Sequence, residues 1–126
     1  MKEEQEQKIL AQWLRMKYPN VIFHSDFGSG AKLTMGQAQR QKALNGGRRA
    51  WPDLFIAEPN KNYAGLFIEF KRTGTKLYKK DGSLISNSHV QEQDDVLDAL
   101  RFRGYRAIFA CGFEEAKKVI MEYLDD

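Results

Sequence analysis

The chain has 126 residues, of which 42% are hydrophobic and 29% charged, a size and balance that fit one globular domain and argue against a disordered chain. No apolar run approaches the roughly 20 residues of a membrane span, and the only cysteine, Cys111, excludes an internal disulfide and a cysteine-rich zinc site. The net charge of +3 is unevenly distributed, because residues 32–80 hold eleven basic and three acidic residues. Such a block is typical of a surface that binds a polyanion, although a solvated basic face has the same composition.

The first third of the chain predicts two helices with a short strand between them. Apolar side chains at helical spacing favour a helix over residues 3–17. Its apolar stripe is formed by Ile9, Leu10, Trp13 and Leu14. A strand is expected over 21–23, followed by a glycine-rich loop over 26–32. Thr34 is placed to cap a helix over 35–44.

The rest of the chain predicts a hairpin and then helices alternating with a strand. Two strands, 54–57 and 65–71, are joined by turn residues, and Asp81-Gly82 indicates a second, small hairpin. The elements that follow are a helix from its expected cap Ser88 to Arg103, which Gly104 ends, a strand over 105–110 and a helix over 113–124. This order predicts an α/β domain around a mixed sheet.

The strand expected over 65–71 carries a polar face. Successive side chains of a strand point to opposite sides, so Glu69 and Lys71 share one face while Leu66, Ile68 and Phe70 point to the core. Asp53 begins the neighbouring strand, and pairing of the two strands would bring its carboxylate close to that of Glu69. Two such carboxylates repel each other unless a cation lies between them. Oxygen ligands, to which the Phe70 carbonyl could add one, suit Mg²⁺ or Mn²⁺.

A lysine beside such a cation suits hydrolysis of a phosphodiester. Lys71 could orient an attacking water or help to deprotonate it, while the cation lowers the pKa of the water and neutralises phosphate charge. The basic block would hold nucleic acid through its phosphates; the alternative is that these side chains lie on solvated loops. The basic residues expected to contact DNA are Arg40, Lys42, Arg48, Arg49, Arg72, Lys76, Lys79 and Lys80.

Two sequence motifs carry a resemblance to a known superfamily. Trp51-Pro52-Asp53 and Glu69-Phe70-Lys71, with fifteen residues between the two acids, resemble the signature of the PD-(D/E)XK nucleases. The strand 65–71, the segment from His89 to Gln93 and the segment 100–107 resemble the virus-type replication-repair nuclease (VRR-NUC) family, and most closely its small stand-alone phage members. The resemblance extends from Glu6-Gln7 to the segment 112–117.

The resemblance implies a fold and a set of site residues. The fold would be a restriction-endonuclease-like αβββαβ core with a carboxyl-terminal helix, forming a single VRR-NUC-type domain over 1–126. Asp53 and Glu69, with the Phe70 carbonyl, match the metal-binding site, and Lys71 matches the catalytic lysine. Gln93 matches a glutamine that faces the active site. Trp51 stands where many relatives have glycine, which leaves the metal motif intact but could shape substrate access.

The sequence leaves two further assignments undecided: which acid of the first helix belongs to the site, and what His89 does. Glu6 is the choice for the acid that the family places on its first helix, as a catalytic residue and metal ligand. Glu3, one helical turn earlier, is its rival. His89 lies one turn before Gln93, and either touches the scissile phosphate or helps to begin the helix.

The function implied is a structure-selective DNA endonuclease that requires Mg²⁺ or Mn²⁺ and acts on branched DNA in phage replication or repair. A four-way (Holliday) junction has two equivalent strands to cut, so a two-fold homodimer is expected. The polar first seven residues and the single cysteine favour a cytosolic compartment, that of a bacterial host if the chain is phage-encoded. The alternatives are a monomeric flap or nick nuclease, a binding module that recognises DNA shape without turnover, and a small-molecule or RNA phosphodiesterase.

Overall fold

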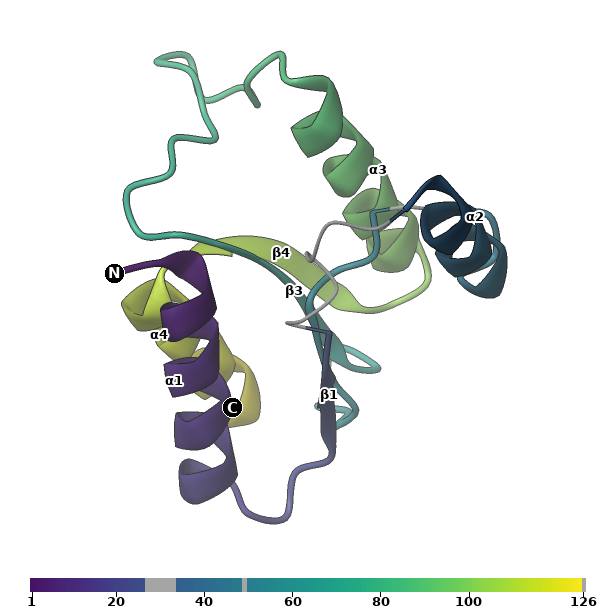
Figure 1. Cartoon of the computed structure of the whole chain (residues 1–126). Coiled ribbons are helices and arrows are strands. Elements are labelled where there is room, and N and C mark those ends of the chain that lie inside the picture. Colours follow the sequence, from purple (N-terminus) through teal and green to yellow (C-terminus); the bar gives the residue numbers. More distant parts are fainter. Residues whose placement is uncertain (27–33, 49, 126) are drawn as a thin grey trace.

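The computed structural model describes residues 1–26, 34–48 and 50–125 of the chain. Within these residues, helices and strands follow one another in the order predicted from the sequence (Figure 1). They are α1 (Glu3–Lys17), β1 (Phe23–Ser25), α2 (Met35–Leu44), β2 (Leu54–Ile56), β3 (Leu66–Lys71), α3 (Ser88–Phe102), β4 (Arg106–Cys111) and α4 (Phe113–Leu124). None of the described helices is both long enough and apolar enough to cross a membrane.

The strands of the described residues form one mixed sheet in the order β1-β2-β3-β4. β2 and β3 are the antiparallel strands of the predicted hairpin, with Leu54 opposite Ile68, and β1 is antiparallel to β2. β3 and β4 are parallel, and α3 forms the crossover connection that parallel neighbours require. The predicted α/β domain around a mixed sheet is confirmed.

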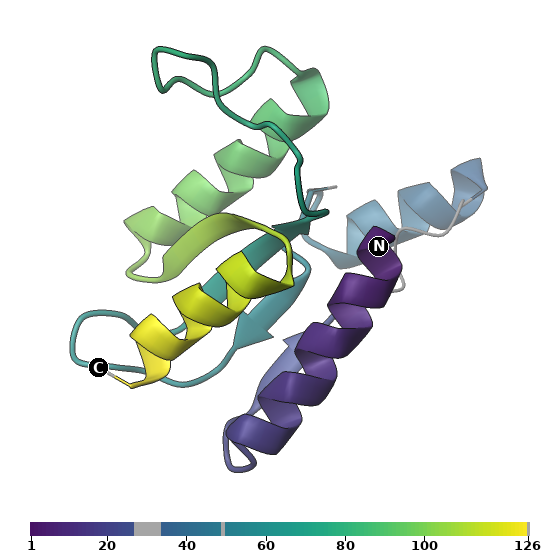
Figure 2. The ribbon, with the colours of Figure 1, turned by 90° about the vertical axis from the view of Figure 1, so that its left-hand side faces the viewer.

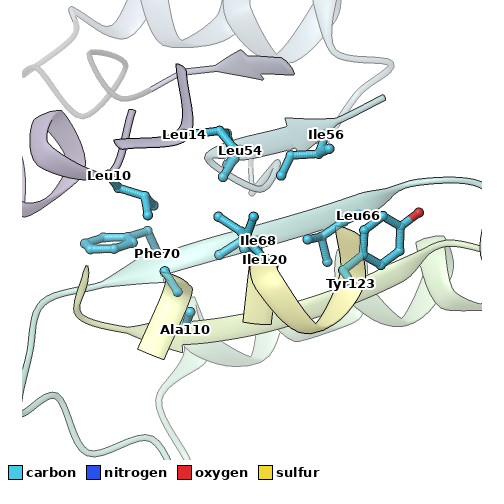
Figure 3. Close-up of a cluster of buried hydrophobic side chains, with 11 residues drawn as sticks. Leu10, Leu14, Leu54, Ile56, Leu66, Ile68, Phe70, Ala110, Ile120 and Tyr123 are labelled. Carbon is cyan, nitrogen blue, oxygen red and sulfur yellow. The ribbon is translucent and has the colours of Figure 1, made fainter. Parts of the chain in front are cut away.

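One face of the sheet is covered by α1 and α4, which lie side by side (Figures 1 and 2). Leu66, Ile68 and Phe70 of β3 point to this face, as the alternation predicts, and all three are fully buried. Figure 3 shows them in contact with the apolar side chains of both helices. Full burial of each such side chain contributes roughly 1.5–3 kcal/mol, so this layer anchors β3 in the centre of the domain.

The opposite face of the sheet is covered by α3. Phe67 of β3 and Phe109 of β4 are buried there against one stripe of the helix. That stripe is formed by Val90, Val96, Leu97 and Leu100. Glu69 and Lys71 follow Phe67 on the same face, so the polar end of β3 lies beneath the amino-terminal half of α3.

The helix α2 differs from the others because it has no buried residue. Thr34 caps it as predicted, and its hydroxyl accepts a hydrogen bond from the Gln37 N–H at 3.1 Å. The helix stands apart from the two layers (Figure 1). At its carboxyl end, the Trp51 indole N–H donates to the Asn45 carbonyl at 3.0 Å. This bond ties α2 to the segment that leads into β2.

Two details of the helix predictions were wrong. Ile9 is 37% exposed, because Leu10 and Leu14, both fully buried, define the side of α1 that meets the sheet. The cap of α3 is Asn87 rather than Ser88, because the Asn87 side chain accepts the hydrogen bond of the Val90 N–H at 3.0 Å. Gly104 follows α3 with φ +96°, which confirms it as the stop signal.

The first strand lies two residues later than predicted, at Phe23–Ser25. Pairing decides its position, because Phe23 lies opposite Ile56 of β2, whereas Ile22 is 73% exposed. The Asp81-Gly82 hairpin forms, but with a single bridge between Tyr78 and Leu84. Most of the glycine-rich loop expected over 26–32 lies outside the described residues.

Candidate active site

The carboxyl groups of Asp53 and Glu69 meet at the end of the β2–β3 hairpin. Because Leu54 pairs with Ile68, the next register position places Asp53 opposite Glu69, close enough for each carboxyl group to shift the pKa of the other. Asp53 Oδ2 also accepts the Phe70 N–H at 2.9 Å, and the Asp53 carbonyl accepts the Asp26 N–H at 2.7 Å. The predicted proximity of the two carboxyl groups is therefore confirmed.

Burial and mutual repulsion raise the pKa of both acids. Burial is the largest cause for Glu69, which is 5% exposed, and the charge of Asp53 adds to it; together they raise the pKa of Glu69 to about 9, although Lys71 opposes them. Burial also raises the pKa of Asp53 to about 6, while the hydrogen bond from Phe70 acts in the opposite direction. Without metal, the pair therefore retains a proton at pH values at which an ordinary glutamate is already ionised.

Gln93 joins this carboxyl pair to the lysine. Its Nε2 donates to Glu69 Oε1 at 2.6 Å, and its Oε1 accepts from Lys71 Nζ at 2.7 Å. Gln93 is 6% exposed and lies on the buried stripe of α3, three residues after Val90 and four before Leu97. The packing of α3 therefore fixes the amide, and the amide fixes the lysine ammonium beside the carboxylates.

The chemistry of the pair fits a hard cation. Glu69 Oε2 is buried and has no hydrogen-bond partner, which is costly for a carboxylate oxygen unless a cation or a proton satisfies it. Asp53, Glu69 and the Phe70 carbonyl could supply oxygen ligands to such an ion. Within the described residues, no group of three or more acids, histidines or cysteines converges on one point. A Mg²⁺ ion, which usually keeps several waters, needs few protein ligands.

The structure separates the two acids of α1 that the sequence left as rivals. Glu6 accepts hydrogen bonds from the N–H of Thr73 at 3.0 Å and from its hydroxyl, and these bonds, with the nearby Phe113 N–H, lower the pKa of Glu6. Glu3, by contrast, is the α1 acid whose charge raises the pKa of both Asp53 and Glu69. The electrostatic neighbour of the pair on this helix is therefore Glu3.

The basic residues expected at DNA lie on two segments. Arg40 and Lys42 belong to α2 and Arg48 follows it, whereas Arg72, Lys76, Lys79 and Lys80 lie on the long connection between β3 and α3. Apart from the half-buried Lys42, all of them are exposed, as is His89 in the first turn of α3. Arg49 lies outside the described residues.

Two residues of the site were not singled out from the sequence for the roles they have. Thr73 is the partner of Glu6, a contact across 67 positions that no local pattern signals. Trp51 links the end of α2 to Pro52-Asp53 and packs against Phe67 of β3. For Glu6, a signal was present: it lies four residues before Leu10 and eight before Leu14, on the stripe that is buried.

Comparisons with known proteins identify the fold. No model of a protein family matches the chain, and no curated protein matches it. A solved structure described as "VRR_NUC domain protein" superposes with a TM-score of 0.67 and 21% sequence identity, over 99% of this chain and 89% of that chain. The protein thus belongs to the class of α/β domains in which helices flank a mixed sheet. More narrowly, the chain has the fold of a VRR-NUC domain, as predicted from the motifs.

Proposed function

We propose that this protein is a divalent-metal-dependent DNA endonuclease that hydrolyses phosphodiester bonds in branched DNA. The observation that carries the proposal is the buried, unpartnered Oε2 of Glu69, which lies in a carboxyl pair and is connected through Gln93 to Lys71. The likeness to a VRR_NUC domain protein supports a nuclease. A role in phage replication or repair is part of the proposal.

The residues of the site have distinct roles in this proposal. Asp53, Glu69 and the Phe70 carbonyl hold a Mg²⁺ or Mn²⁺ ion, with Glu3 adding negative charge nearby. When bound, this ion neutralises charge on a phosphate and lowers the pKa of water. Lys71 Nζ, held by Gln93 Oε1, orients the attacking water and stabilises the negative charge that develops on the phosphate oxygens.

The direct test is cleavage of a panel of labelled DNAs. We expect metal-dependent cutting of flapped and four-way DNA in Mg²⁺ or Mn²⁺, little cutting of linear duplex, and none in EDTA. A four-way junction should be the preferred substrate, and sedimentation should show a homodimer, since two sites related by a two-fold axis match its two equivalent strands. A stable monomer on and off DNA would instead leave flap or nick processing, and metal-enhanced binding without product would indicate a binding module.

The basic residues of α2 and of the connection between β3 and α3 should contribute to DNA binding without contributing to the stability of the fold. The described residues 34–48 contain three basic residues and no acidic residue. Replacing Arg40 and Lys42 together by glutamine should weaken DNA binding and lower the slope of log K against log salt by about 0.9 for each phosphate that is no longer neutralised. The melting temperature should not change, because α2 buries no residue.

The control for this prediction removes the same charge elsewhere. Lys17 at the end of α1 and Lys118 on α4 are exposed, and their double glutamine variant should keep the affinity and salt slope of the parent. Equally weakened binding in both variants would mean that net charge alone, rather than docking on α2, determines binding.

A further inference from the structure

Glu6 is a buried acid whose partners lie outside the carboxyl pair. It is 5% exposed, and Thr73 donates to both of its oxygens, one from the backbone N–H at 3.0 Å and one from the hydroxyl. The N–H of Phe113, the first residue of α4, lies near enough to Glu6 to help lower its pKa. Burial by itself would raise the pKa of Glu6, but these hydrogen bonds outweigh it and lower the pKa, so the group stays ionised at neutral pH.

Thr73 lies two residues beyond Lys71, where the chain leaves β3. The carbonyl of Lys71 accepts the Gly112 N–H at 2.8 Å, and Gly112 has φ +93°. A Cβ atom at Gly112 would collide with the Thr73 hydroxyl, so this close approach requires glycine. Three segments therefore converge at one point: the first turns of α1, the exit of β3 and the beginning of α4.

This point is where the catalytic strand most needs support. Lys71 is the last residue of β3, and it is followed by a long connection to α3 without a regular helix or strand, in which the described backbone forms turn hydrogen bonds and the bridge between Tyr78 and Leu84. Strand ends next to long connections open at low free-energy cost unless other contacts hold them. The carboxylate of Glu6 supplies such contacts from α1, whose Leu10 and Leu14 are fixed in the core.

We propose that Glu6 is a positioning residue, which holds Thr73 and thereby fixes the exit of β3 and the ammonium group of Lys71, and that it is not a ligand of the metal. The inference rests on the proposed nuclease function for its catalytic consequence. It replaces the role that the family resemblance implied for Glu6. Thr73 donates to each of the two oxygens of Glu6, so binding a cation would require Glu6 to give up or share these hydrogen bonds.

The test compares Glu6→Ala, Thr73→Val and their double variant with Glu4→Ala, which removes an exposed acid from the same turn. We measure Mn²⁺ affinity, the single-turnover cleavage rate at saturating metal and DNA, and hydrogen exchange of the Lys71 and Thr73 amides. Glu6→Ala and Thr73→Val should each slow cleavage by roughly 10- to 100-fold, the cost of a misplaced catalytic group. The double variant should be no slower than the slower single variant, because both changes break one contact.

Further outcomes separate positioning from the other roles of an acid. Mn²⁺ affinity should equal that of the parent in every variant, faster exchange should be confined to the β3 exit, and Thr73→Ser, which keeps the hydroxyl, should cleave at the parent rate. Weaker Mn²⁺ binding by Glu6→Ala but not by Thr73→Val would make Glu6 a ligand and overturn the inference. Lower melting temperatures with an unchanged cleavage rate would also overturn it, because the clamp would then be structural only.

The positioning role can still be tested if one variant does not fold or if the parent does not cut DNA. If Glu6→Ala does not fold, Thr73→Val carries the comparison, since it leaves Glu6 the N–H donor of Thr73. If the parent cuts no DNA, the proposed function fails by itself. Hydrogen exchange then decides the positioning role, which is supported by faster exchange at the β3 exit in Thr73→Val than in Glu4→Ala and refuted by equal exchange.

Discussion

Replacing Lys71 by alanine should abolish DNA cleavage while leaving the fold and most of the DNA affinity intact. The ammonium group is the only cation hydrogen-bonded to Gln93 among the described residues, and Gln93 in turn contacts Glu69. Its removal takes away the group that orients the attacking water, for which a decrease of roughly 10²- to 10⁴-fold is typical. Single-turnover cleavage of a four-way junction in Mn²⁺ measures this decrease.

A second lysine provides the control for this result. Lys118→Ala removes an exposed ammonium group from α4 and should cleave at the parent rate. Both variants should melt as cooperatively as the parent, because Lys71 is only half-buried and contributes no apolar packing to either core cluster. Parent-like cutting by Lys71→Ala would remove the lysine from the reaction and refute the assignment of the site.

The carboxyl pair could be predicted from sequence because its geometry follows from local rules. Alternation along β3 separates Glu69 from Ile68 and Phe70, and a hairpin with Leu54 opposite Ile68 has room for Asp53 only opposite Glu69. Gln93 was implied by the family resemblance rather than by such rules, and its place on one helical stripe with Val90 and Leu97 agrees with that prediction.

The choice between Glu3 and Glu6 could not be made in this way. Both acids lie in the first turn of α1, and the helical period alone gives each of them a plausible inward direction. The decision depends on how α1 is rotated against the sheet, which Leu10 and Leu14 fix through contacts with strands distant in sequence. The same dependence on tertiary pairing explains why β1 begins at Phe23 rather than at Val21.

The cap of α3 shows a different limit. Asn87 and Ser88 are adjacent, and both are residue types that favour the cap position. A sequence pattern cannot separate them, because the difference between them is one residue of helix and one hydrogen bond to Val90. Element boundaries of this kind depend on the geometry of the preceding connection, which here carries the buried Leu77.

The metal-free protein should lose stability as the pH rises from the ordinary range of a glutamate, near 4.5, to about 9. The folded state raises the pKa of Glu69 and Asp53, so it holds a proton that the unfolded chain has already released in this window. The unfolded state then binds fewer protons than the folded state, and the free energy of unfolding falls by up to about 1.4 kcal/mol per pH unit for each proton held. Denaturant unfolding in EDTA across this range measures the slope.

Mn²⁺ should reverse this pH dependence, because a cation between the carboxylates replaces the proton as their counter-charge. Calorimetric titration in buffers of different ionisation enthalpy should therefore show proton release on metal binding at neutral pH. The matched variant is Asp53→Asn, which can keep the acceptor for the Phe70 N–H but removes the charge that repels Glu69.

Asp53→Asn should show a shallower fall in stability with pH in EDTA, should gain little stability from Mn²⁺ and should not cut DNA. The free energy of unfolding of the variant, relative to that of the parent, should therefore rise with pH, although the variant is inactive. Such a trade-off between stability and activity is expected where a site keeps repelling charges for function. Parallel stability curves for parent and variant, with equal stabilisation by Mn²⁺, would show that the pair neither stores the proton nor binds the metal. The buried Glu69 Oε2 would then need a different explanation.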